Sequence, residues 1–268
     1  MGLPGYQAPE RRRPAVLTAI VLTLNEEKHL ADCLASLDWA PRVVVYDCFS
    51  TDRTLEIARA AGAEVKQRAW DNFAGQRNAA LAAVDSQWVL FVDADERVTP
   101  ALAREVQSVL EQPQAGWWIP RHNYLFGRLT LHTGWYPDYQ MRLLQREKAR
   151  YDPARPVHEL VLLDGEAGYM QAPFVHLNYD RVAEFIAKQK SYAAYDASRL
   201  QAEGIRAKPH HFILQPLRQF YWRLITLQGW RDGWHGLRLS LLMSLFEFEK
   251  YRCLWRAQRP SPSPLPPG

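Results

Sequence analysis

Apolar runs alternate with amphipathic stretches through the first 110 residues of the chain. Residues 15–24 and 87–92 are continuous apolar runs, a pattern typical of strands that are buried on both faces of a parallel sheet. Residues 42–46 and 64–67 predict two further strands. Apolar residues three and four positions apart predict a helix after each strand, at 30–37, 55–61, 73–84 and 100–110. This alternation with short connections predicts a doubly wound α/β fold.

Polar residues follow the expected strands at the points where these strands end. Asn25 and Glu26 come after the first strand, Asp47 after the second, and Asp93 and Asp95 after the fourth. The carboxyl ends of parallel strands meet at one edge of the sheet, where ligands bind in open α/β folds. Each residue alone has an ordinary explanation as a turn former or a helix cap. Their shared position at one edge indicates a binding site.

The stretch Asp93-Ala94-Asp95-Glu96 places three carboxylates directly after a buried strand. Adjacent anions repel each other and resist desolvation, so such a cluster does not serve stability. Two Asp side chains that flank one small residue can both reach a hard divalent cation, which prefers oxygen ligands and bridges to phosphates. The alternative for an isolated Asp-x-Asp is a solvated acidic turn. The buried strand before it and the polar residues upstream favour the metal.

From residue 117 onward the chain becomes rich in aromatic residues and glycine. Aromatic faces with fixed amides and carboxylates are suited to holding sugar rings, although the tandem tryptophans at 117–118 fit a packed core better. Residues 140–145 predict another strand, and two titratable residues follow it. Glu159 is either a general base or a surface residue. His176 is either a neutral metal ligand or a histidine satisfied within the core.

Residues 181–256 predict three amphipathic helical segments in a basic part of the chain. Residues 181–268 contain 14 Lys and Arg against 6 Asp and Glu, a net charge of +8, whereas residues 1–180 contain 19 against 23, a net charge of −4. Basic amphipathic helices with Trp and Tyr can lie in an anionic membrane surface. The alternatives are that their apolar faces cover the sheet or form a dimer interface. Residues 1–14 and 257–268 read as tails, the second of them proline-rich.

Several classes of protein lack their usual sequence signals here. No G-x-G-x-x-G follows the first strand and no G-x-x-x-x-G-K-[ST] occurs, which removes the main support for dinucleotide redox chemistry and P-loop phosphoryl transfer. We expect neither a signal peptide nor a spanning helix, because the N-terminus has no apolar core and no run of 18 apolar residues exists. The three cysteines show no metal-ligand spacing and no obvious pairing, which favours a reduced, cytoplasmic setting.

Seven stretches of sequence together indicate a known family. They are LTLNEEKHLADCLASL, VVVYDCFSTDRTLEIARAAGAEV, FAGQRNAAL, WVLFVDADERVTPAL, GWYPDYQMRLL, RPVHE and DGWHGLRLS…KYRCLW, in this order over about residues 16–256. The chain thereby resembles the inverting glycosyltransferases of family 2, and more narrowly the bacterial lipopolysaccharide-core β-glucosyltransferases. It departs at Asp47-Cys48-Phe49-Ser50, where relatives usually carry small residues after the aspartate, so Phe49 would narrow the nucleotide pocket.

The resemblance implies a GT-A fold for residues 15–180, a Rossmann-like, mostly parallel sheet flanked by helices, with a C-terminal helical extension at 181–256. It implies that Asp95 and His176 hold Mg²⁺ or Mn²⁺. Glu159 would be the catalytic base, with Asp138 as a competitor. The residues that would bind the nucleotide-sugar donor are Asn25, Glu26, Asp47, Arg77 and Asp93.

The function that this resemblance implies is transfer of a hexose from a nucleotide sugar, such as UDP-glucose, to a glycolipid or cell-envelope glycan. We expect the protein in the cytoplasm, peripheral at the inner face of the cytoplasmic membrane, with no nucleic-acid partner and with dimerisation left open. A rival enzyme class is a sugar-nucleotide nucleotidyltransferase, which needs a glycine-rich basic loop after the first strand. A second rival is a non-enzymatic membrane or nucleic-acid binding module built on the basic C-terminal helices, which leaves the aligned carboxylates unexplained.

Overall fold

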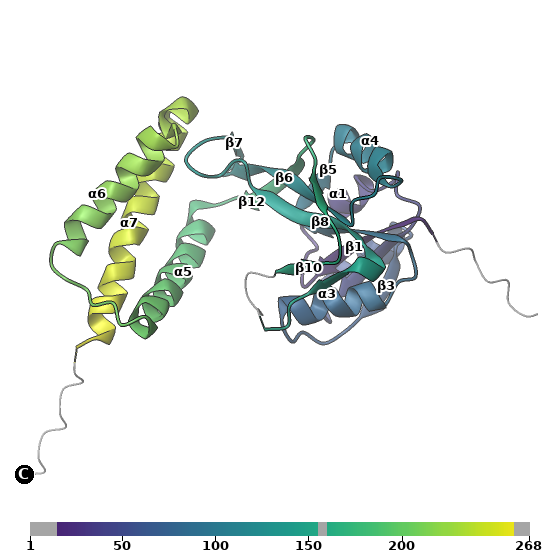
Figure 1. Cartoon of the computed structure of the whole chain (residues 1–268), viewed down its shortest axis with the longest axis horizontal. Coiled ribbons are helices and arrows are strands. Elements are labelled where there is room, and N and C mark those ends of the chain that lie inside the picture. Colours follow the sequence, from purple (N-terminus) through teal and green to yellow (C-terminus); the bar gives the residue numbers. More distant parts are fainter. Residues whose placement is uncertain (1–14, 155–159, 260–268) are drawn as a thin grey trace, which may run out of the picture. The chain divides into compact units, whose positions relative to one another are not determined.

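The computed structural model describes residues 15–154 and 160–259, which form two compact units (Figure 1). The first unit contains residues 15–120 and 139–174, and the second contains residues 121–138 and 175–259. Two strands, β6 (Gly116–Leu125) and β12 (Phe174–Tyr179), run from the first unit into the second. The single domain boundary expected near residue 180 stays a prediction.

The first unit is built on a mixed sheet whose strands follow the order β3-β2-β1-β4-β8-β6. β1, β2, β3 and β4 are parallel, as the apolar runs predicted, whereas β8 is antiparallel to both of its neighbours. A short strand, β11, extends the sheet beside β6. The strands of this unit are β1 (Leu17–Thr23), β2 (Val43–Asp47), β3 (Glu64–Gln67), β4 (Trp88–Asp93), β5 (Glu96–Val98), β8 (Tyr139–Gln145), β9 (Ala149–Tyr151), β10 (Val161–Leu163) and β11 (Ala167–Tyr169).

Helices cover both faces of this sheet. On one face, the β1 side chains Leu17, Ala19 and Val21 pack with buried residues of α1, α2 and α4. On the other face, Ile20 packs with buried residues of α3. Burial on both faces is the reason that these strands read as continuous apolar runs and not as alternating ones. The helical elements are α1 (Leu30–Ala35), α2 (Thr54–Ala60), α3 (Phe73–Ala82), α4 (Pro100–Val109) and the 3-10 turn η1 (Arg146–Lys148).

The second unit consists of the far halves of β6 and β12, a hairpin strand and a group of helices. The strand β7 (Arg128–Thr130) pairs with β6. The elements after β12 are α5 (Val182–Ala202), α6 (His211–Tyr221), the π-helical turn η2 (Trp222–Thr226), the 3-10 turn η3 (Gly229–Asp232) and α7 (Gly233–Ala257). These elements confirm the three helical segments that the amphipathic pattern predicted.

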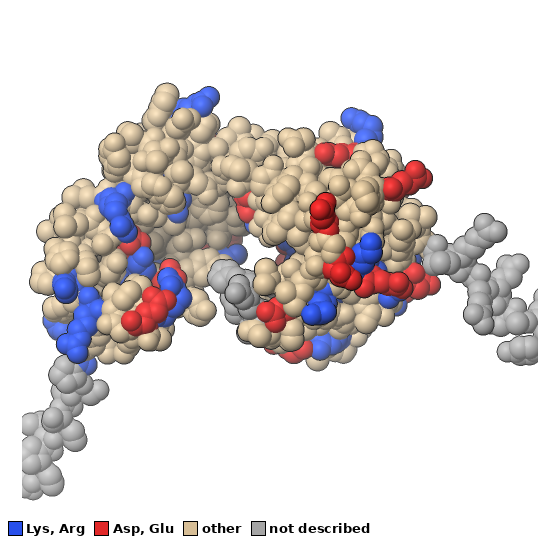
Figure 2. Space-filling view, viewed as in Figure 1, with Lys and Arg blue, Asp and Glu red and all other residues tan. Residues whose placement is uncertain are grey.

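Aromatic and polar contacts hold α7 against its two neighbours. The rings of Phe246 on α7 and Phe185 on α5 are 5.8 Å apart, and those of Trp255 and Phe212 on α6 are 5.9 Å apart. Ser244 donates a hydrogen bond to the carbonyl of Pro216 at 2.8 Å. Lys and Arg gather on this unit near the C-terminal end of the chain (Figure 2). Over the residues that the structure describes, no helix is both long and apolar enough to cross a membrane.

Candidate donor site

The register of the parallel strands brings the predicted polar residues to one edge of the sheet. Thr23 at the end of β1 is the partner of Asp47 at the end of β2, and Leu22 is the partner of Asp93 at the end of β4. Asn25 and Glu26 follow β1 directly, and Asp95 lies in the two-residue turn between β4 and β5. The sequence prediction that these residues share one sheet edge is therefore confirmed.

Asp47 is buried and its carboxylate is held by donors from two strands and a loop. Thr23 of β1 donates at 3.0 Å, Gln67 of β3 at 3.1 Å, and the backbone N–H of Ser50 at 2.9 Å. Such a set of donors fixes the start of the 48–53 loop relative to the sheet. What the structure shows for Asp47 is thus a positioning role at the sheet edge, and its contact with a nucleoside stays a prediction.

Hydrogen bonds brace the loop after β1 against the loop after β2. Asn25 adopts a left-handed conformation with φ of 57°, and its side-chain carbonyl accepts the backbone N–H of Thr51 at 2.9 Å. The backbone N–H of Glu26 donates to the Thr54 hydroxyl at 2.8 Å. Phe49 also has a positive φ, 60°, and its ring is exposed. A bulky residue at positive φ costs about 1 kcal/mol or more of conformational free energy. The hydrogen bonds of the braced loop offset this cost, and the Phe49 ring stays exposed.

Asp93 is clamped between two buried arginines. Arg77 of α3 contacts its Oδ1 at 3.1 Å and lies over the Phe91 ring, with 5.0 Å from its guanidinium carbon to the ring centroid. Arg142 of β8 forms an ion pair with Oδ2, and it also lies 3.5 Å from the fully buried carboxylate of Glu96. The backbone N–H of Asp93 donates to Glu96 at 2.9 Å. Arg77 therefore holds the Asp93 carboxylate in place. Its predicted contact with the nucleotide stays a prediction.

Arg142→Met should lower the free energy of unfolding by about 3–5 kcal/mol, because it removes the cation that the fully buried Glu96 carboxylate shares with the half-buried Asp93. The measurement is urea-induced unfolding. The matched control is Arg146→Met, a change directly after the same strand that breaks the surface pair with Glu147 and one hydrogen bond to the carbonyl of Ser86, and it should cost about 1 kcal/mol. If both variants lose the same free energy of unfolding, the buried ion pairs around Asp93 contribute no more to stability than a surface pair.

Negative charge accumulates beside this clamp. The pKa of Glu26 is raised to about 7, first by its burial and then by the negative charges of Asp95, Asp52 and Asp93, while Arg97 opposes the shift. A buried carboxyl group among other carboxylates resists ionisation, because both desolvation and like charge disfavour its charged form. The oxygen-rich set around Asp95 fits a hard divalent cation, which would offset that charge.

Asp138 and His176 belong to the second unit, where one amide connects them. Asn123 donates to the Asp138 carboxylate at 3.0 Å, and its carbonyl oxygen lies 2.6 Å from Nδ1 of the buried His176. Asp138 also pairs with Arg121 at 2.6 Å. The Asn123 amide nitrogen is a donor to Asp138, so its oxygen must accept, and Nδ1 of His176 must carry the proton. A neutral ring protonated at Nδ1 carries its lone pair on Nε2. This is the tautomer in which Nε2 can bind a metal ion.

The described residues do not complete a metal site by themselves. Among residues 15–154 and 160–259, no group of three or more His, Cys, Asp and Glu side chains is arranged to hold an ion. Mg²⁺ and similar ions are commonly held by one or two carboxylates together with substrate phosphates and water. Asp95 fits such a partial set. The predicted base Glu159 lies outside the described residues.

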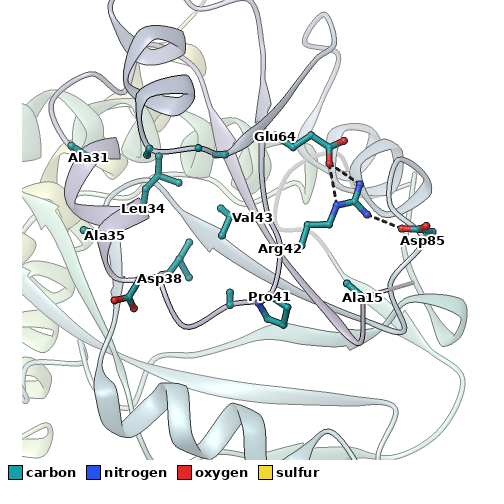
Figure 3. A pocket seen from close by; sticks show the side chains of 15 residues that line it. Ala15, Ala31, Leu34, Ala35, Asp38, Pro41, Arg42, Val43, Glu64 and Asp85 are labelled. Atoms are coloured by element: carbon teal, nitrogen blue, oxygen red, sulfur yellow. Dashed lines mark hydrogen bonds and ion pairs between the residues drawn. The ribbon is translucent and has the colours of Figure 1, made fainter. Parts of the chain in front are cut away.

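A hollow of about 820 Å³ lies at the opposite ends of the strands, away from the carboxylate cluster (Figure 3). Its polar wall is Arg42, which pairs with Glu64 and with Asp85 at 2.7 Å each. The stretches that line it lead into the amino ends of β1, β2, β3 and β4. None of the predicted site residues lines this hollow, so the candidate site is the carboxyl edge.

Sequence reasoning missed the residues that hold the site residues in place. Arg142 and Glu96 steady Asp93, and Asn123 with Arg121 steadies Asp138 and His176. The available signal was a charged residue inside an apolar strand, as Arg142 is within QMRLLQ. A buried charge in such a position needs a partner of opposite charge.

A sequence model of glycosyl transferase family 2 matches residues 18–172, more than half of the chain. The lipopolysaccharide core biosynthesis glycosyltransferase LpsC of Rhizobium meliloti is 29% identical over 246 residues, which cover 87% of this chain and 89% of LpsC. A TPR repeat-containing protein of Synechococcus elongatus is 34% identical over 149 residues, which cover 55% of this chain and 36% of that protein.

The fold is also found in a solved glycosyltransferase. A mannosyltransferase of Pyrobaculum calidifontis, solved in complex with GDP-Man and Mn²⁺, superposes with a TM-score of 0.53 at 14% sequence identity. The superposition covers 96% of this chain and 92% of the mannosyltransferase. At this identity the likeness concerns the fold alone. It confirms the predicted GT-A arrangement of a sheet flanked by helices with a C-terminal helical region.

Proposed function

Because the chain belongs to glycosyl transferase family 2, we propose that it transfers a hexose from a nucleotide sugar, such as UDP-glucose, to a glycolipid or cell-envelope glycan, with inversion at the anomeric carbon. The observation that carries this proposal is the cluster of the Glu26, Asp93 and Asp95 carboxylates at the carboxyl edge of the parallel strands. The proposed ligands of a divalent ion are Asp95 and His176. Asp95 belongs to this cluster, and His176 is proposed because its Nδ1 contact with Asn123 leaves the lone pair on Nε2.

Each remaining residue has a task in a single displacement. The loops that Asp47 and Asn25 brace would receive the nucleoside, and Arg77 with Arg142 would hold the Asp93 side chain in place. A carboxylate, Glu159 or Asp138, would take the proton from the acceptor hydroxyl as it attacks the anomeric carbon, typically a 10²–10⁴-fold effect. A bound Mg²⁺ or Mn²⁺ supplies stabilisation of the charge on the departing diphosphate.

The relatives support the proposed acceptor and location. LpsC is named for lipopolysaccharide core biosynthesis and aligns over 87% of this chain, which supports a cell-envelope acceptor at the inner face of the cytoplasmic membrane. Mn²⁺ accompanies the donor in the Pyrobaculum mannosyltransferase complex, which supports a divalent ion here. Family membership removes both the nucleotidyltransferase and the non-enzymatic binding module as alternatives.

A donor-panel measurement tests the proposal. Binding of UDP-, GDP- and dTDP-sugars is measured by calorimetry with Mn²⁺ and again with a chelator. We expect a UDP-sugar to bind at least about tenfold more tightly than the others, and the preference to disappear when the ion is removed, since the diphosphate is then unsupported. GDP-sugar binding of the same strength would redirect the donor assignment. Failure of every donor to bind would overturn the proposed transferase chemistry.

A further inference from the structure

The helices of the second unit leave two apolar stripes exposed to solvent. On α7, Trp234, Leu241 and Leu245 are seven and four residues apart, so they lie along one side of the helix, and their exposed fractions are 74%, 47% and 63%. On α6, Ile213, Leu217 and Tyr221 repeat every fourth residue and are exposed by 63%, 59% and 62%. Such stripes are the pattern of amphipathic helices that bury one face against something outside the unit.

The turn between these stripes is also apolar and aromatic. Trp222 in η2 and Trp230 in η3 are both exposed, so with Trp234 the turn region displays three indole rings. Trp is costly to leave in water and is enriched at membrane–water interfaces because its ring is apolar while its N–H is polar. We call the two stripes together with this turn the indole surface.

None of these side chains belongs to the buried apolar clusters of this unit. The contacts of α7 with α5 and α6 run through Phe246, Ser244 and Trp255, which point to other sides of the helix. One set of apolar residues thus holds the helices together, and a second set is exposed to solvent. A second apolar set that is exposed and lies outside these clusters is available to a partner beyond the unit.

Charge decides which partner fits. Residues 205–246 contain six Lys and Arg against one acidic residue, Asp232. The Asp232 carboxylate is largely buried and accepts hydrogen bonds from His132 at 2.7 and 3.0 Å. Arg218 and Arg231 are exposed beside the apolar residues. The segment therefore presents apolar side chains and positive charge together, without an exposed carboxylate.

We propose that the indole surface docks this protein onto an anionic lipid bilayer, with the tryptophans and leucines in the interface and Arg218 and Arg231 on the phosphate headgroups. Anionic headgroups attract basic residues near the membrane surface. A second copy of this chain fits less well, because a two-fold interface would bring together two patches that both carry positive charge. None of the residues of this surface belongs to the candidate donor site, so docking does not depend on the proposed donor chemistry.

The test is co-flotation of the full-length protein with vesicles of phosphatidylethanolamine and phosphatidylglycerol, without donor or metal. Trp230→Ser/Trp234→Ser should weaken vesicle binding by about tenfold or more, because two exposed indoles no longer leave water. Arg218→Gln/Arg231→Gln should weaken it by about tenfold on these vesicles and leave weak binding to phosphatidylcholine unchanged. The matched control is Tyr192→Ser/Tyr195→Ser, which removes two exposed aromatics from α5 and should leave vesicle binding as it is.

Three results would overturn docking. If wild type and the tryptophan variant bind vesicles equally well, the indole surface does not contact the membrane. A dimer in sedimentation that the tryptophan variant dissociates, without vesicle binding, assigns the surface to a second copy. Absence of vesicle binding together with a lower unfolding temperature of that variant assigns it to packing within the chain. Donor hydrolysis by the same variants is measured separately, so failure of docking and failure of the transferase proposal are distinguished.

Discussion

Asp95→Ala is expected to lower metal-dependent hydrolysis of the nucleotide-sugar donor by about 10³-fold, with little change in folding. Loss of a metal ligand removes several kcal/mol of charge stabilisation on the leaving diphosphate, and about 1.4 kcal/mol corresponds to a factor of ten in rate. Asp95 lies in the turn between β4 and β5, half-buried beside Glu26, so its removal should also relieve repulsion within the cluster. The measurement is donor hydrolysis over a Mn²⁺ titration, with thermal unfolding in parallel.

A matched control is Asp85→Ala at the opposite ends of the strands. Asp85 pairs with Arg42 at the hollow shown in Figure 3, and its side chain is 70% exposed. This variant should keep full hydrolysis and lose at most about 1 kcal/mol of stability, as exposed ion pairs generally do. Full activity of Asp95→Ala would remove Asp95 from the ion, and an equal loss with and without Mn²⁺ would assign it a different role.

The second large effect is expected at the catalytic base. Glu159→Gln should keep donor binding but lower transfer to the acceptor by about 10²–10⁴-fold, because the hydroxyl then lacks a group to accept its proton. Asp138→Asn should behave differently. Arg121 and Asn123 already hold the Asp138 carboxylate, so its neutralisation leaves Arg121 without its partner anion and should lower stability. Four quantities are measured for each variant: the donor affinity, the transfer rate, the pH profile of that rate and the free energy of unfolding.

The two carboxylates exchange roles if transfer fails in Asp138→Asn while its stability is unchanged and Glu159→Gln is active. The base variant should also lose the acidic limb of the pH–rate profile, which a structural role does not affect. Glu166→Gln, an exposed carboxylate on the loop after β10, serves as the control and should match wild type in all four measurements.

Asn123 and Arg142 show how far local sequence patterns reach into the site. Asn123 lies within an aromatic stretch where nothing marks it, yet it connects His176 to Asp138 through two hydrogen bonds. Arg142 lies 49 residues from Asp93, on a strand that runs antiparallel between two others. Partners this distant along the chain are set by strand order and register, which hydrophobic periodicity does not encode.

The sequence by itself determined the parallel strands, the helices between them and the single edge at which Asn25, Glu26, Asp47, Asp93 and Asp95 meet. Burial on both faces leaves continuous apolar runs, and parallel strands place all of their carboxyl ends together, so both follow from local pattern and chain order. The tertiary structure alone decided what those side chains do. Asp47 is a buried brace, Asp93 is clamped by two arginines, and Glu26 has its pKa raised by burial and by the charges around it. These properties depend on desolvation and on the distance between charges, and both arise only when remote segments pack together.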